Sequence, residues 1–121
     1  MTAPSLPAAL RAGASGLYAL EAATGLIIAH GTWLTRGDFT CLIEHGTETA
    51  AIDWEAAAAE LEAGGLPSSG GERRMLWLAA SLAGQAPVIL GDVITGIDDL
   101  NTGLLVKAVL HASGQRQFPA C

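Results

Sequence analysis

The sequence predicts an all-α fold, in which a compact single-domain bundle of about five to six helices surrounds a central apolar helix. The first observation is the stretch from Ala14 to His30, whose leucine, isoleucine, alanine and glycine residues fall on every side of a helical wheel. A helix that is apolar all round is buried on all sides. The second observation is that the other helical segments are apolar on one face only, so each needs a surface to pack against. The third is the length of 121 residues, which is typical of one domain.

The central helix is expected to end at His30, and its pattern could begin as early as Ala8. Glu21 is the only charged side chain of this stretch when His30 is neutral. One face consists mainly of small residues, which let a neighbouring backbone come close. These residues are Ala22, Gly25 and Ala29. Either another helix of the same chain or a second copy of the chain can use such a face, and we predict that it contributes to the seam of a homo-oligomer.

Capping residues and apolar stripes predict the other helices. Ser69, followed three residues later by Glu72, forms a capping box that opens a helix. The segment 88–97 is rich in β-branched residues, yet its apolar residues follow helical spacing and no second strand is available to pair with it. The expected helices span residues 36–45, 54–63, 71–83, a short stretch within 88–97, and a last helix that Asp98 caps and that runs to Ser113.

The ends of the single domain, residues 1–121, are expected to be loose. Residues 1–7 form a flexible lead-in because Pro4 and Pro7 restrict the chain, and residues 115–121 form a flexible tail after Gly114.

The helix expected at 36–45 should have Thr35 as its N-cap and Gly46 as the residue that ends it.

Charge is sparse and mostly negative. Charged residues make up 15% of the chain, against about 25% in typical domains, and the net charge is −6. This balance disfavours phosphate backbones and anionic membranes as partners. Between Gly37 and Glu72 there are eight acidic side chains and no lysine or arginine. That region is either a solvated acidic face or a docking surface for a basic protein partner.

Cysteine content and hydropathy predict a cytoplasmic protein. The two cysteines, Cys41 and Cys121, are too few for a disulfide framework, and residues 1–13 lack the pattern of a secretory signal. The central apolar stretch is rich in weakly hydrophobic alanine and glycine and has Glu21 in its middle. We therefore expect no membrane-spanning helix.

The stretches GLYALEAATGLIIAHGTWL and GGERRMLWLAASLAGQAPVILGDVITGIDDLNTGLLVKAVLHASG carry a resemblance. They resemble small, alanine-rich, acidic proteins encoded by actinomycete bacteria, often among the genes of mobile or phage-like elements. The resemblance implies a bacterial, cytoplasmic setting and transfers no site residue.

Two chemical functions remain as alternatives. A small metal-dependent enzyme would use Cys41 and His45, which are four residues apart on the expected helix, but two ligands make only half a site, so we expect no metal, no cofactor and no catalytic residue. A helix-turn-helix-like DNA-binding regulator would use the last three helices. Its recognition helix opens with Asp98 and Asp99 and has Lys107 as its single basic residue, so nucleic acid is an unfavourable partner.

The remaining interpretation is a non-enzymatic protein–protein interaction, regulatory or adaptor module that self-associates. The low charge, the high apolar content of 50% and the acidic middle region favour it. Trp77 lies one helical turn after Arg73, so the guanidinium can stack on the indole ring. An exposed tryptophan beside an arginine is typical of interaction hot spots, whereas a packed tryptophan under an arginine is ordinary core. The predicted interaction surface comprises Ala22, Gly25, Ala29, Arg73 and Trp77.

Overall fold

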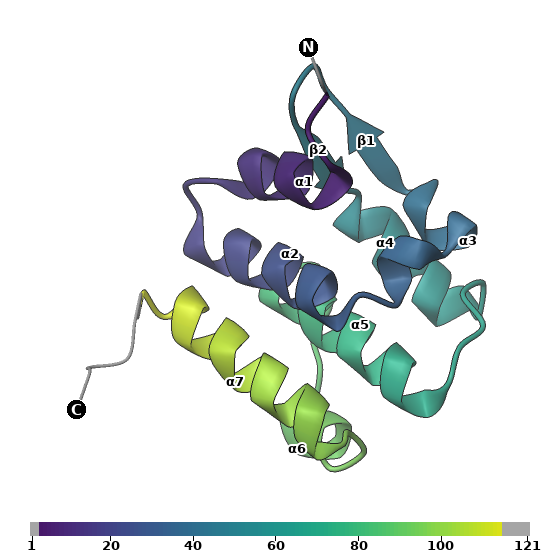
Figure 1. Cartoon of the computed structure of the whole chain (residues 1–121). Coiled ribbons are helices and arrows are strands. Elements are labelled where there is room, and N and C mark those ends of the chain that lie inside the picture. Colours follow the sequence, from purple (N-terminus) through teal and green to yellow (C-terminus); the bar gives the residue numbers. More distant parts are fainter. Residues whose placement is uncertain (1–2, 115–121) are drawn as a thin grey trace.

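The computed structural model describes residues 3–114 and is mainly helical (Figure 1). The helical elements are α1 (Leu6–Ala14), α2 (Tyr18–His30), the 3-10 turn η1 (Trp33–Thr35), α3 (Gly37–Thr40), α4 (Trp54–Ala63), α5 (Gly70–Leu82), α6 (Leu90–Ile94) and α7 (Asp99–Ala112). Two short strands, β1 (Ile43–His45) and β2 (Ala50–Ile52), pair antiparallel with Ile43 opposite Ile52. The prediction of a mainly helical fold is confirmed, and the hairpin corrects the expectation that it is all-α.

The helix predicted at 36–45 is wrong. Helix α3 ends at Thr40, and the chain then turns into β1. Gly46 does not stop a helix but lies in the hairpin turn, where its N–H donates to the Thr49 carbonyl at 2.8 Å. Thr35 does not cap α3 either, because its hydroxyl donates to the Thr32 carbonyl. Pairing between the two strands satisfies backbone groups that a longer α3 would have satisfied within itself.

The apolar stretch from Ala14 to His30 is not one continuous helix. Helices α1 and α2 are separated at Gly16, whose φ of +106° lies in a region that residues with a side chain rarely adopt. Ser5 caps α1 by accepting a hydrogen bond from Ala8 N–H at 3.3 Å, so Leu6 and Pro7, which were expected in the lead-in, belong to α1. The predicted flexible tail, 115–121, falls outside the residues that the structure describes.

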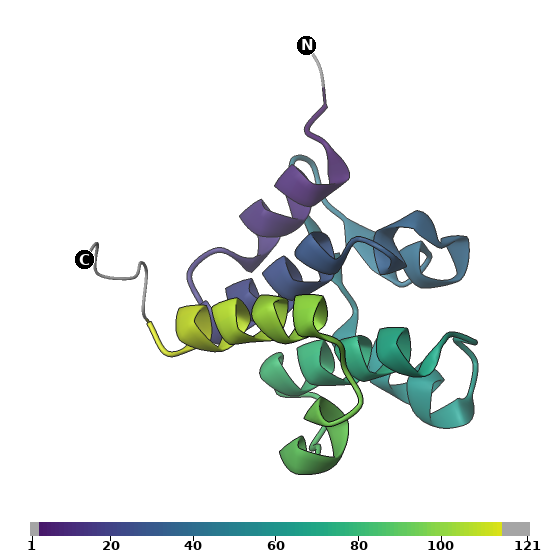
Figure 2. The same ribbon diagram turned by 60° about the horizontal axis from the view of Figure 1, so that its bottom comes forward.

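Helix α2 packs against α1, α5, α7 and η1 (Figures 1 and 2). Its buried residues are Ala22, Ala23, Thr24, Leu26 and Ile27. Tyr18, Ala19 and Ala29 are exposed. The burial of α2 is therefore one-sided, and a strip of its surface stays open.

Three helices begin close to where the sequence predicts them, and each has a side-chain cap, which at α5 and α7 is the predicted residue. Asp53 accepts a hydrogen bond from Ala56 N–H at the start of α4, and Asp98 accepts one from Asn101 N–H at the start of α7. The capping box of Ser69 and Glu72 is formed in both directions at the start of α5. Within residues 3–114, no helix combines the length and hydropathy needed to cross a bilayer.

The loop after α2 is anchored in the core by Trp33. Its ring is fully buried and lies beside Phe39, with the ring centroids 5.6 Å apart. The indole N–H donates to the Glu72 carbonyl at 3.1 Å, which joins this loop to the first turn of α5. The guanidinium of Arg36 lies over the same ring at 4.5 Å.

Helix α1 approaches the backbone of β2 so closely that Gly13 has no room for a side chain. A Cβ at Gly13 would overlap the carbonyl oxygen of Ala50. We expect Gly13→Ala to lower the free energy of unfolding by about 1–3 kcal/mol, because α1 or β2 must shift. Gly103→Ala is the control: the glycine lies within α7 and a Cβ there meets nothing within 4 Å. It should raise the stability by about 0.5–1 kcal/mol. Urea denaturation of both variants measures the difference, and equal effects would contradict the close approach.

His30, at the end of α2, makes stability depend on pH. Its Nδ1 is buried and has no hydrogen-bond partner among the described residues, and burial lowers its pKa more than Glu72 and Asp98 raise it. The unfolded chain therefore takes up a proton at a higher pH than the folded chain. The contribution of His30 to the free energy of unfolding should be fully present above the ordinary histidine pKa of about 6.5. It should decrease as the pH falls toward the lowered pKa of the folded chain.

The variant His30→Gln tests this pH dependence. We expect its free energy of unfolding to change less than that of the parent chain between about pH 7.5 and about pH 5.5. His45→Gln is the control, because His45 is exposed on β1. The interpretation fails if the two variants lose the same stability over this range.

Candidate functional site

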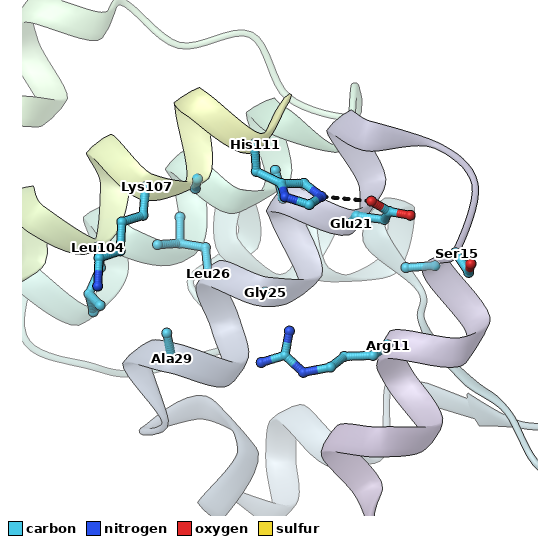
Figure 3. Close-up of a pocket in the computed structure, with 12 residues that line it drawn as sticks. Arg11, Ser15, Glu21, Gly25, Leu26, Ala29, Leu104, Lys107 and His111 are labelled. Atoms are coloured by element: carbon cyan, nitrogen blue, oxygen red, sulfur yellow. Dashed lines mark hydrogen bonds and ion pairs between the residues drawn. The ribbon is translucent and has the colours of Figure 1, made fainter. Parts of the chain in front are cut away.

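A groove of about 360 Å³ follows the open strip of α2 between α1 and α7 (Figure 3). Helix α2 forms its floor, and the end of α1 and one side of α7 form its walls. The lining residues are Arg11, Ala14 and Ser15 from α1 and the turn after it, Glu21, Ala22, Gly25, Leu26 and Ala29 from α2, and Leu104, Lys107, Ala108 and His111 from α7.

The groove exists because the residues on the floor are small. A Cβ at Gly25 would meet only a guanidinium nitrogen of Arg11, at 4.0 Å. Ala22 is 3% exposed and Ala29 is exposed. The sequence predicts this small-residue face as part of a seam between two chains. In the structure the face lies between α1 and α7 of the same chain. A second chain would have to enter the groove to reach Gly25.

Two cations line this groove without a hydrogen-bond or ion-pair partner among residues 3–114. Arg11 extends from α1 toward Gly25, and Lys107 comes from α7 on the other side (Figure 3). No hydrogen bond or ion pair joins either side chain to another described residue. The other three arginines in residues 3–114 are engaged: Arg36 with the Asp38 carboxylate, Arg73 with the Leu61 carbonyl and Arg74 with the Gly96 carbonyl.

One end of the groove is organised by Glu21. One of its carboxylate oxygens lies 2.6 Å from His111 Nε2, and the other accepts a hydrogen bond from Gly16 N–H at 2.8 Å. The Tyr18 ring meets the imidazole edge-on, with centroids 5.9 Å apart. Glu21 therefore connects the turn between α1 and α2 to the last turn of α7.

The sequence does not indicate this arrangement because its members are far apart in the chain. Arg11 belongs to α1, and Lys107 and His111 belong to α7. Neither cation is part of a short motif. The one local signal was the small-residue face of α2, which indicated close approach of another segment but not which one.

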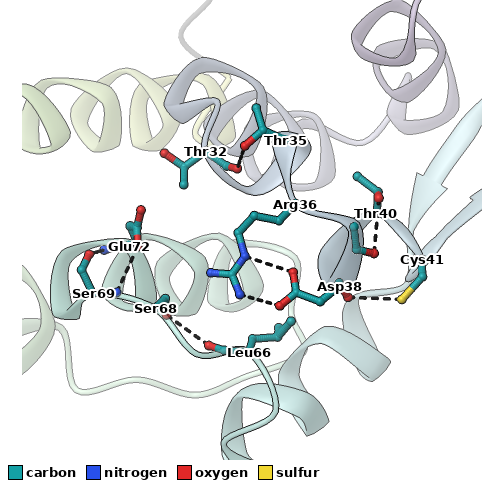
Figure 4. Close-up of polar contacts among 11 residues, drawn as sticks. Thr32, Thr35, Arg36, Asp38, Thr40, Cys41, Leu66, Ser68, Ser69 and Glu72 are labelled. Atoms are coloured by element: carbon teal, nitrogen blue, oxygen red, sulfur yellow. Dashed lines mark hydrogen bonds and ion pairs between the residues drawn. The ribbon is translucent and has the colours of Figure 1, made fainter.

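Cys41 and His45 do not share a helix face. Cys41 is the C-cap that follows α3, and its Sγ donates to the Asp38 carbonyl at 3.2 Å (Figure 4). His45 is in β1. The predicted two-ligand arrangement on one helix is therefore wrong. Within residues 3–114, no three histidine, cysteine, aspartate or glutamate side chains are placed to hold a metal ion.

Arg73 and Trp77 both make contacts within the fold. Trp77 is half-buried against the core, and Arg73 donates a hydrogen bond to the Leu61 carbonyl in the last turn of α4. The arginine–tryptophan stacking that the structure shows among its described residues is between Arg36 and Trp33. Arg36 also forms a two-pronged contact with Asp38, at 3.0 and 2.5 Å, which lowers the pKa of that carboxyl (Figure 4).

A second surface lies where α6 leads into α7 (Figure 2). We name residues 89–100 the α6–α7 corner. Four of its large apolar side chains are exposed: Ile89 by 73%, Leu90 by 55%, Ile94 by 39% and Leu100 by 74%. The corner also contains three exposed aspartates, Asp92, Asp98 and Asp99, and no lysine or arginine.

The sequence matches no family model, no curated protein and no solved structure.

Proposed function

We propose that the chain is a non-enzymatic protein–protein interaction module that self-associates through the α6–α7 corner. The observation that carries the proposal is the exposure of Ile89, Leu90, Ile94 and Leu100 within twelve residues of sequence. Clusters of exposed large apolar side chains mark interaction surfaces more often than isolated ones do. A bacterial, cytoplasmic setting, as the resemblance and the cysteine content suggest, belongs to this proposal.

The free energy gained by burying the apolar side chains of the corner is of the right size for a reversible contact. Burying a side chain of the size of leucine contributes about 1.5–3 kcal/mol, and these four side chains have between two fifths and three quarters of their surface still to bury. Association itself costs about 4–15 kcal/mol. A symmetric dimer buries the corner of both copies, so its apolar gain is twice that of one chain.

Charge gives the proposal a distinctive salt dependence. In a symmetric dimer the same surface is used twice, so the carboxylates of Asp92, Asp98 and Asp99 on one copy approach those on the other. Salt screens this repulsion. Self-association through the corner should therefore strengthen as the salt concentration rises.

A basic protein partner is the second candidate, and the same three aspartates favour it. An apolar segment flanked by lysine or arginine would cover the leucine and isoleucine side chains and also pair with the carboxylates. Binding of such a partner should weaken as salt rises, which distinguishes it from self-association. In this case the chain would act as an adaptor or regulatory module.

DNA binding and metal-dependent catalysis have less support. Leu105 and Ala108 of α7, the expected recognition helix, are buried, and the exposed residues at its start are Asp99 and Leu100. These side chains suit neither phosphates nor the polar edges of bases.

The variant Leu100→Glu tests self-association. We expect it to raise the dimer dissociation constant at least tenfold, because it removes apolar surface and adds a like charge. Leu17→Glu is the control, since Leu17 is 65% exposed and adjoins Tyr18, which contacts His111 at the opposite end of α7. Sedimentation equilibrium at about 50 mM and about 500 mM salt measures both the constant and its salt dependence.

A third variant separates this surface from the seam predicted from sequence. Gly25→Leu should leave the dissociation constant of the dimer unchanged if the corner is the contact. If Gly25→Leu dissociates the dimer and Leu100→Glu does not, the contact is the small-residue face of α2. A parent chain that stays monomeric at all salt concentrations overturns self-association.

A further inference from the structure

We propose that the groove between α1, α2 and α7 binds a small organic anion, in which a carboxylate or phosphate group is joined to a compact apolar body. Arg11 and Lys107, the two cations that have no partner among the described residues, both line this groove. The inference concerns a surface other than the α6–α7 corner and does not rest on the proposed self-association.

The charge distribution supports an anionic head group. The chain has a net charge of −6 and only six basic side chains, so two cations that line the same groove are a notable concentration of positive charge. Here Arg11 and Lys107 approach one groove from two different helices. A planar guanidinium can hold two oxygens of a carboxylate or phosphate, and an ammonium group adds a point charge without fixed geometry. An anion held between them would be attracted by both positive charges.

The floor and walls support an apolar body. The groove is also lined by Gly25, Leu26 and Ala29 of α2, and by Leu104 and Ala108 of α7. A volume of about 360 Å³ is at the lower end of the range of small-molecule sites. An inorganic ion would contact the cations but leave the apolar floor uncovered, so a molecule with a short hydrocarbon part fits better.

Glu21 sets the orientation of the ligand. Its carboxylate already pairs with His111 and with the Gly16 N–H at one end of the groove. A second anion is repelled from that end and is held by Arg11 and Lys107 instead. The apolar body then lies against the floor formed by Gly25 and Leu26.

The test is a titration of the full chain with octanoate, followed by the backbone amide signals in proton–nitrogen NMR spectra. We expect saturable shifts for Gly25 and Ala29, with a dissociation constant below about 1 mM. The neutral analogue octanamide should bind at least about tenfold more weakly, because it lacks the charge-assisted hydrogen bonds. Octyl phosphate, titrated in the same way, shows which head group the cations prefer.

Four variants connect the binding to the groove. Arg11→Gln and Lys107→Gln should each weaken octanoate binding roughly tenfold. Gly25→Leu should abolish it, because the new side chain fills the floor. Gly103→Leu changes a glycine within α7 where a Cβ meets nothing, so it should leave binding unchanged. Arg74→Gln removes a positive charge outside the groove and should also have little effect.

Several outcomes would overturn the inference. Octanoate that does not saturate, or that binds Gly25→Leu as well as Gly103→Leu, shows that the groove is not the site. Equal binding of octanoate and octanamide shows that the cations do not select an anion. If Gly25→Leu does not fold, the Arg11→Gln and Lys107→Gln titrations still decide the matter, since both residues are exposed and neither side chain has a hydrogen-bond or ion-pair partner within residues 3–114.

Discussion

The burial of one side of α2 against α5 and α7 is the constraint on which the remaining structure depends. Ala23, Leu26 and Ile27 supply this buried side, and the loop after the helix is fixed by Trp33. Because the open face of α2 has the small residues Ala22, Gly25 and Ala29, α1 and α7 approach the same helix from two directions and leave a groove over Gly25. The groove therefore forms where the side chains of α2 are small. Leaving these residues uncovered costs little apolar burial, because glycine and alanine have little surface to bury.

The single acidic residue of the apolar stretch has a structural role that its sequence position does not reveal. Glu21 accepts a hydrogen bond from the Gly16 N–H and also pairs with His111 of α7. A carboxylate in an otherwise uncharged helix is costly to desolvate unless it is paired. Here the pairing holds the turn between α1 and α2 against the end of α7, so one side chain fixes the relative positions of the helices that enclose the groove.

The parts of the fold that sequence predicted are those that depend on local chemistry. Asp53, Ser69 and Asp98 cap their helices through hydrogen bonds to backbone groups three residues away, so the signal and the structure lie in the same segment. The hairpin was missed because Ile43 and Ile52 stabilise each other only when paired, and each strand is too short to show a period. The groove was missed for the same reason: Arg11 and Lys107 are brought to one groove only through the packing of α1 and α7 on α2.

Both proposed surfaces include residues of α7. Because few residues of this helix are buried, a ligand at one surface could change how α7 is held at the other. Leu105 and Ala108 are its buried residues, Lys107 faces the groove, and Leu100 belongs to the corner. An anion held by both Arg11 and Lys107 would connect α1 to α7 across the floor of α2, and would therefore restrain the helix that presents Leu100. Ligand binding in the groove would then affect the corner by reducing the motion of α7, without a new contact at the corner. If that restraint is real, octanoate will strengthen self-association, and by thermodynamic reciprocity the dimer will bind octanoate more tightly by the same factor.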